Sequence, residues 1–226
     1  MSPVARRAVH VAGSILISAV ILFGAAGRLA WSWAWIYLGL SVTASLVAAA
    51  VLLPHHRDLI VERETALAHA RLWDRGLASA ATVLASRLGP LVAGLDVRLH
   101  WSATLPSGWR LAGLGGFAAG TALYLWAMAS NPFFSTVVRI QTERGHRVVD
   151  TGPYHALRHP GYLGWIVAET AVPLILGSTW ALLPAALGCA LWVERTALED
   201  RTLHEELTGY VGYARRVRYR LLPGIW

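Results

Sequence analysis

The sequence contains no lysine and only one cysteine, Cys189, among its 226 residues. A single cysteine excludes a disulfide framework within the chain and a metal site built from several thiolates. Charge is also scarce, because 15% of the residues are charged whereas 55% are hydrophobic. The mean hydropathy of +0.47 is too high for an ordinary soluble domain. These features favour an integral membrane protein.

The sequence also lacks the short motifs of several soluble enzyme classes. It has no Walker loop, no G-x-S-x-G elbow, no C-x-x-C pair and no G-x-G-x-x-G signature. A soluble methyltransferase of the Rossmann type is therefore disfavoured, and we predict no metal site.

Four apolar stretches are long enough to enter a bilayer, which takes about 20 residues of helix. They cover residues 8–27, 31–53, 111–130 and 162–193. A weaker stretch, residues 77–95, is interrupted by Arg87 and Gly89-Pro90. Because 32 residues of helix would measure about 48 Å against a bilayer core of about 30 Å, residues 162–193 should form a hairpin that turns at Gly177-Ser178. The predicted fold is all-α, a polytopic membrane helical bundle with about five to six transmembrane helices.

The twenty arginines are distributed unevenly over the predicted loops. With six spans, sixteen of them lie on the side of the amino terminus and three on the other side, with Arg87 inside a span. This positive-inside bias predicts that both termini are cytoplasmic. Anionic lipid headgroups rather than nucleic acid are the expected partners of this charge. The oligomeric state stays open.

Two polar clusters flank the predicted hairpin. Residues 158–162 precede it and residues 195–200 follow it, so both should lie on the cytoplasmic side. Pro160 suits the first turn of a helix, whose free N–H groups favour an anion. Arg195 and Glu199 lie one helical turn apart on one face. By spacing alone these features also fit an ordinary helix start and an intrahelical salt bridge.

Two ionisable residues lie within apolar stretches, Glu169 and Arg87. An ionisable group at membrane depth indicates a functional site by default. A structural hydrogen bond for Glu169, and water at the Gly89-Pro90 break for Arg87, are the alternatives. The sequence leaves both roles open.

The order RHPxYxG, apolar hairpin and RxxxE[ED] resembles the isoprenylcysteine carboxyl methyltransferase family, in a superfamily shared with phospholipid N-methyltransferases. The resemblance runs from about Asn131 to Trp226 and includes the GPY that precedes RHPGYLG. It implies that S-adenosylmethionine (SAM) is the co-substrate. The first 130 residues resemble mainly bacterial members, which implies a location in a bacterial inner membrane. The resemblance divides one continuous membrane domain into N-terminal transmembrane helices with a connector, residues 1–130, and a SAM-binding core, residues 131–226.

The resemblance also implies roles for individual residues. Arg195 matches the arginine assigned to the substrate carboxylate, and Glu199 matches a glutamate assigned to SAM. Asp200 replaces the usual second glutamate. The cofactor-binding set implied in this way is Gln141, His146, Arg147, Val148, Val149, Tyr154, Arg158, His159, Pro160, Gly161, Tyr162, Glu199 and Asp200.

The expected reaction is methyl transfer to a lipophilic small molecule or lipidated acceptor at the membrane interface. A carboxylate acceptor is already ionised at neutral pH and requires no general base. A phospholipid amine or a small thiol are the alternative acceptors within the class. A sterol-type membrane reductase and a transporter are the alternatives outside it, and the sequence does not identify the acceptor or the pathway.

Overall fold

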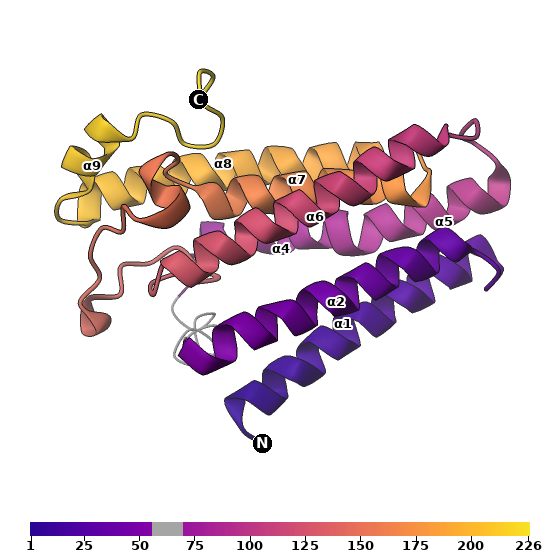
Figure 1. Ribbon diagram of the computed structural model, residues 1–226, viewed down its shortest axis with the longest axis horizontal. Helices are drawn as coiled ribbons and strands as arrows, with labels where there is room; N and C mark the ends of the chain where they lie inside the picture. Colours follow the sequence, from indigo (N-terminus) through magenta and orange to yellow (C-terminus); the bar gives the residue numbers. More distant parts are fainter. Residues whose placement is uncertain (56–69) are drawn as a thin grey trace.

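The computed structural model describes residues 1–55 and 70–226. Within these residues the regular structure is entirely helical, without a strand (Figure 1). The elements are α1 (Pro3–Ala26), α2 (Ser32–His55), α4 (Leu72–Val83), η2 (Leu84–Leu88), α5 (Gly89–Leu99), α6 (Ser107–Ser130), η3 (Thr142–Arg144), η4 (Gly152–His155), α7 (Pro160–Leu176), α8 (Leu182–Glu206) and α9 (Tyr210–Arg216). The predicted all-α class is confirmed.

Four helical segments are long and apolar enough to cross a membrane: Val4–Ala26, Ser32–Pro54, Leu72–Leu99 and Ser107–Ser130. α7 is a shorter apolar helix, and α8 has 25 residues whose second half carries charge. The chain is therefore a polytopic helical membrane bundle, with four such spans and the α7–α8 pair.

The predicted hairpin is confirmed. α7 ends at Leu176, Gly177 takes the left-handed conformation that favours glycine, with φ 77°, and α8 begins at Leu182. Beside this turn, Asp96 of α5 accepts hydrogen bonds from the hydroxyls of Ser178 at 2.5 Å and Ser102 at 2.6 Å. These bonds hold together the end of the bundle opposite the one that carries α9.

The predicted interruption of the third span is wrong. α4, η2 and α5 form one run from Leu72 to Leu99, and the five residues Leu84–Leu88 form a π-helical turn. Pro90 lacks an N–H and its ring crowds the preceding turn, and a π turn accommodates such a defect without ending the helix. The connector between the second and third spans lies largely outside the described residues, and α4 begins at Leu72.

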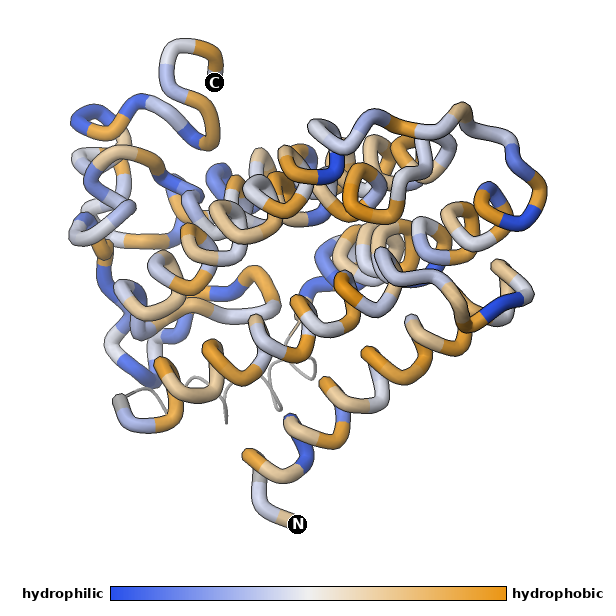
Figure 2. Tube along the Cα trace, turned by 45° about the vertical axis from the view of Figure 1, so that its right-hand side comes forward, coloured by the Kyte–Doolittle hydropathy of each residue, from blue (hydrophilic) through white to orange (hydrophobic). Residues whose placement is uncertain are grey.

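The outer surface of the bundle is apolar. Large side chains such as Leu16, Leu46, Leu183 and Leu187 are more than half exposed. Figure 2 shows hydrophobic residues along most of α1 and α2 and hydrophilic ones gathered near the chain's C terminus. Exposed apolar side chains of this kind face lipid in a membrane protein.

α6 and α7 cross at two glycines. A Cβ added at Gly120 would lie 2.5 Å from the carbonyl oxygen of Gly164, and one added at Gly164 would lie 2.6 Å from that of Gly120. Small residues at such crossings allow helix backbones to approach closely in membranes. This crossing sets the position of α7, which carries the first polar cluster.

We predict that Gly120→Ala destabilises the folded protein by about 1–3 kcal/mol, because the added methyl overpacks the crossing. Gly115→Ala is the matched control in the same helix, since a Cβ there meets nothing within 4 Å. The control should gain slightly from alanine's helix propensity. Thermal unfolding in detergent checks both variants, and equal melting temperatures would contradict the packing argument.

Candidate active site

A cavity of about 810 Å³ opens at the end of the bundle that carries α9. Its wall is formed by α6, α7, α8 and the segment between α6 and α7, and one limb extends between α1, α2 and α4. Eleven of the fourteen predicted site residues line it: His146, Arg147, Val148, Val149, Tyr154, Arg158, His159, Gly161, Tyr162, Arg195 and Glu199. The structure thus brings most of the predicted set to one cavity. Gln141, Pro160 and Asp200 lie outside its wall.

Tyr162 connects the two polar clusters. Its hydroxyl accepts a hydrogen bond from Nη1 of Arg195 at 2.6 Å and donates one to Oε2 of Glu199 at 2.5 Å. Arg195 and Glu199 lie on α8 and Tyr162 on α7, so the contact spans the hairpin. The simple salt bridge between Arg195 and Glu199 is replaced by a bridge through the tyrosine.

Arg195 is 5% exposed and forms an ion pair that the sequence analysis missed. Its Nε donates to Oδ1 of Asp74 at 2.6 Å, and its Nη2 donates to the carbonyl of Thr136 at 2.8 Å. Asp74 is fully buried on α4 and also accepts from the backbone N–H of Val138 at 2.8 Å. With the bond to Tyr162, three of the five guanidinium N–H groups have partners, and two remain for a ligand.

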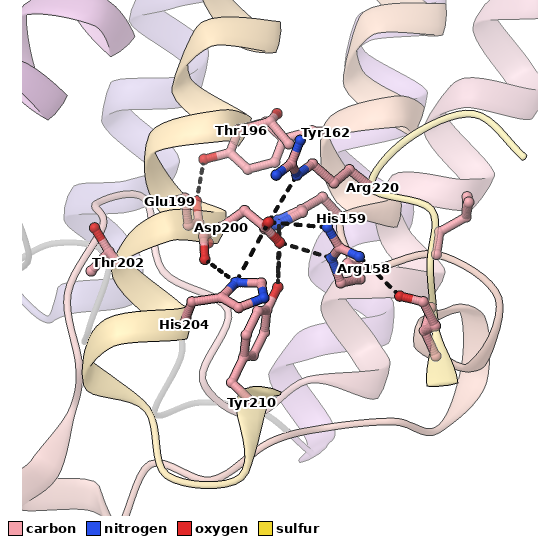
Figure 3. Close-up of polar contacts among 12 residues, drawn as sticks. Arg158, His159, Tyr162, Thr196, Glu199, Asp200, Thr202, His204, Tyr210 and Arg220 are labelled. Carbon is pink, nitrogen blue, oxygen red and sulfur yellow. Dashed lines mark hydrogen bonds and ion pairs between the residues drawn. The ribbon is translucent and has the colours of Figure 1, made fainter. Parts of the chain in front are cut away.

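Asp200 is the centre of a second network, next to the cavity rather than on its wall (Figure 3). Its carboxylate, 1% exposed, accepts from five donors: Nε and Nη2 of Arg158 at 2.8 and 3.0 Å, Nε2 of His159 at 3.1 Å, the Tyr210 hydroxyl at 2.8 Å and Nε of Arg220 at 2.8 Å. Arg158 also donates through Nη1 to the carbonyls of Val217 and Arg218. The network therefore attaches the C-terminal segment to the start of α7.

The charge state of Asp200 follows from these contacts. Burial by itself raises the pKa of a carboxyl group, but the hydrogen bonds from His159, Arg158 and Arg220 outweigh it and hold the pKa of Asp200 well below its ordinary value. Asp200 is thus an ionised structural anchor with its acceptor sites occupied. Its predicted contact with a cofactor would be indirect, through Arg158 and His159.

Gln141 fixes the conformation of the segment between α6 and α7 through hydrogen bonds. It is fully buried, its Nε2 donates to the carbonyl of Phe133 at 2.7 Å, and its Oε1 accepts from Nη1 of Arg144 at 2.5 Å. Its backbone N–H donates to Nδ1 of His146 at 3.2 Å. Burial, helped by the charges of Arg139 and Arg144, lowers the pKa of His146 to about 4. His146 is therefore neutral at pH 7 and presents its ring on the cavity wall.

The predicted start of α7 is confirmed at Pro160, with His159 outside the helix at φ −129° and ψ 57°. Pro160 is buried as the first residue of the helix and does not contact the cavity. Gly161 does line it, and a Cβ there would lie 2.6 Å from the ring of Phe134. The glycine thus allows the preceding segment to pack against the helix start.

Three residues of these networks have no counterpart in the sequence prediction: Asp74, Tyr210 and Arg220. Asp74 had one available signal, since it is the last acidic residue before the apolar part of its span. An acid in that position commonly pairs with a basic residue on another helix. Tyr210 and Arg220 lie in a tail whose path no local pattern gives.

Residues 112–205 match the model of the isoprenylcysteine carboxyl methyltransferase family. The resemblance inferred from the sequence is confirmed. This segment carries most of α6, the two 3-10 turns, the hairpin and nearly all of α8. The family segment and the apolar helices together support a membrane methyltransferase of isoprenylcysteine carboxyl methyltransferase type. No curated protein matches the chain.

We predict that Asp200→Asn destabilises the protein by about 3–5 kcal/mol, because it leaves buried Arg158 without its counter-charge. Asp150→Asn is the control, since Asp150 pairs with Arg216 at 3.1 Å while both side chains are more than half exposed. Such a surface pair contributes about 0–1 kcal/mol. Chemical unfolding at pH 7 compares the two variants.

The pH dependence provides a further check of the same prediction. Because the folded-state pKa of Asp200 is depressed, its stabilisation is complete above the unfolded-state pKa of about 4 and is lost only as pH falls towards the folded-state value. The difference between parent and Asp200→Asn should therefore be constant from neutral pH down to that point. A difference that vanished near pH 6 would contradict the assignment.

Proposed function

We propose that the chain transfers a methyl group from SAM to a lipophilic acceptor at the membrane interface. The contact that carries this proposal is the bridge through Tyr162. It joins Arg195, the residue implied for the acceptor, to Glu199, the residue implied for SAM, at 2.6 and 2.5 Å on the wall of one cavity. A methyl donor and an acceptor held by these two residues would be adjacent.

The residues of the cavity fit SAM. Glu199 is the only acidic residue among the described residues of the wall. It lies next to Tyr162, whose ring centroid is 5.7 Å from that of Trp192. A carboxylate beside aromatic rings suits an ammonium or a sulfonium cation. The volume lies within the range of about 300–1,000 Å³ that is typical of ligand sites.

The carboxylate acceptor remains the simplest one for this site. SAM supplies a methyl group on a sulfonium, which becomes a neutral thioether when the acceptor's lone pair takes the methyl. Arg195 has two guanidinium N–H groups left to orient an acceptor carboxylate, and Asp74 fixes the plane of the guanidinium. An anion and a cation that combine to neutral products benefit from a site screened from water.

An amine or thiol acceptor would need a base. Asp200 is unsuited to this role, because its carboxylate already accepts five hydrogen bonds away from the cavity wall. Glu199 accepts the Tyr162 hydroxyl, and the Nε2 of His159 is occupied by Asp200. Asp200 and His159 are therefore engaged, and Glu199 is the residue proposed to hold SAM, which favours an acceptor that is already ionised. The family segment favours methyl transfer over a sterol-type reduction.

The same proposal includes the orientation of the protein in the membrane and the roles of the two halves of the chain. The arginine bias supports cytoplasmic termini, with SAM entering from the cytoplasm. The resemblance of the first 130 residues to bacterial members supports a bacterial inner membrane. Residues from 131 onward would hold SAM, whereas the helices of residues 1–130 would shape the acceptor side.

Glu199→Gln should weaken SAM binding by about 10- to 150-fold, the value of one charge-assisted hydrogen bond. The amide still accepts the Tyr162 hydroxyl, so the fold should be kept. Glu194→Gln, an exposed residue of the same helix, is the control. Arg195→Lys should bind SAM like the parent but use the acceptor less well. Calorimetry with SAM measures the first effect, and unchanged affinity in Glu199→Gln would remove the support for the SAM site.

The pH dependence of the chemical step should distinguish the acceptors. A carboxylate acceptor with a pKa near 4 predicts a rate that is nearly flat from about pH 6 to 8. An amine or thiol predicts a rate that rises with pH as the acceptor loses its proton. Single-turnover transfer from labelled SAM into a membrane lipid extract, with identification of the product, measures this profile. A steep rise would favour the amine or thiol methyltransferase instead.

A further inference from the structure

The limb of the cavity between α1, α2 and α4 lies outside the segment that matches the family. Figure 1 shows α1 and α2 diverging from the other helices towards the end that carries α9. Six side chains with hydroxyl groups line the limb, and we call it the hydroxyl limb: Ser14, Ser41, Ser45, Ser79, Thr82 and Ser86. These residues come from three helices that qualify as membrane spans.

Some of the polar groups of the limb accept hydrogen bonds from Arg87. Its guanidinium donates to Oγ of Ser14 at 3.2 Å, to Oγ of Ser18 at 3.3 Å and to the carbonyl of Ser86 at 2.9 Å. A cation at membrane depth requires such acceptors. Arg87 therefore accounts for the Ser14 hydroxyl, and the Ser86 hydroxyl donates to the carbonyl of Thr82 at 2.6 Å. These contacts leave the other four hydroxyls of the limb unexplained.

Ser41 and Ser45 present hydrogen-bond acceptors to the hydroxyl limb. Oγ of Ser41 donates to the carbonyl of Tyr37 at 2.9 Å, and Oγ of Ser45 donates to that of Ser41 at 2.8 Å. Each hydroxyl has one proton, and both protons are used within α2. The oxygens can still accept, so a ligand with an O–H or N–H group gains a hydrogen bond there that a hydrocarbon does not.

A plain hydrocarbon tail would be a poor occupant of this limb. It would displace water from the Ser41 and Ser45 oxygens, and from Ser79 and Thr82 across the limb, without replacing the lost hydrogen bonds. A tail with a hydrogen-bond donor would satisfy them.

We propose that the hydroxyl limb binds the tail of the methyl acceptor, and that this tail is an apolar chain bearing at least one O–H or N–H group. This inference rests on the proposed methyltransferase function and narrows its acceptor class. The N-terminal helices then select the acceptor by its tail. The segment that matches the family model transfers the methyl group to the acceptor's reactive group.

The test compares two probes of equal length, a saturated long-chain fatty acid and its analogue with a hydroxyl group at mid-chain. Calorimetry on the purified full chain in detergent measures the affinity of each. The parent should bind the hydroxylated probe about 2- to 12-fold more tightly, the value of one net hydrogen bond. The double variant Ser41→Ala/Ser45→Ala should bind both probes equally.

Thr43→Ala is the matched control. Oγ1 of Thr43 donates to the carbonyl of Gly39 at 2.9 Å in the same helix, but the side chain is exposed and outside the cavity wall. This variant loses the same kind of bond and should keep the parent's preference. The two probes partition differently into detergent, but this difference is the same for every variant. It therefore cancels when the ratio of the two affinities in a variant is compared with the ratio in the parent.

Two results would overturn the inference: equal affinities in the parent, or a preference that survives in Ser41→Ala/Ser45→Ala. Transfer from labelled SAM is measured with the same probes. Tighter binding of the hydroxylated probe without methyl transfer would support the limb and count against the carboxylate acceptor. Transfer to both probes with equal affinities would support the proposed function and reject the limb.

Discussion

The site depends on the burial of two arginine side chains with their carboxylates. Arg158 and Asp200 are 9% and 1% exposed, and Arg195 and Asp74 are 5% and 0% exposed. A buried charge is tolerated only when a counter-charge and further hydrogen bonds replace its water. Each pair has these additional bonds, from the C-terminal segment in the first case and from Thr136 and Tyr162 in the second. Both pairs therefore form only when distant parts of the chain are in place.

The Asp74–Arg195 pair extends this dependence to the N-terminal half of the chain. Asp74 lies on α4, before the segment that matches the family, and Arg195 lies within that segment. The N–H of Val138 shares the same carboxylate, so the wall between α6 and α7 is also fixed by α4. The N-terminal helices are thus part of the site and not only a membrane anchor. A change in their packing would move Arg195 and, through Tyr162, Glu199.

Helices with a strong local signal were predictable from the sequence. The hairpin turn at Gly177 and the start of α7 at Pro160 follow from the conformational preferences of these residues. The third span was predicted as interrupted at Arg87 and Gly89-Pro90, whereas a π turn keeps the helix continuous there. For the site, the order of the motifs identified eleven residues that line one cavity. Asp74 was missed because its partner Arg195 lies on another helix far along the sequence, and such pairing leaves no periodic pattern. Tyr210 and Arg220 were missed because no local pattern gives the path of the C-terminal segment.

The position of Tyr162 has a consequence for the order of events in the cavity. Its single hydroxyl proton goes to Glu199, and its oxygen accepts from Arg195. A cation that binds Glu199 competes for the same carboxylate and weakens the first bond. A carboxylate that binds Arg195 competes with the tyrosine for the guanidinium and weakens the second. Because both ligands act on one tyrosine, and because opposite charges attract across it, each should promote the binding of the other. The bridge through Tyr162 would then couple the occupancy of the membrane side to that of the aqueous side.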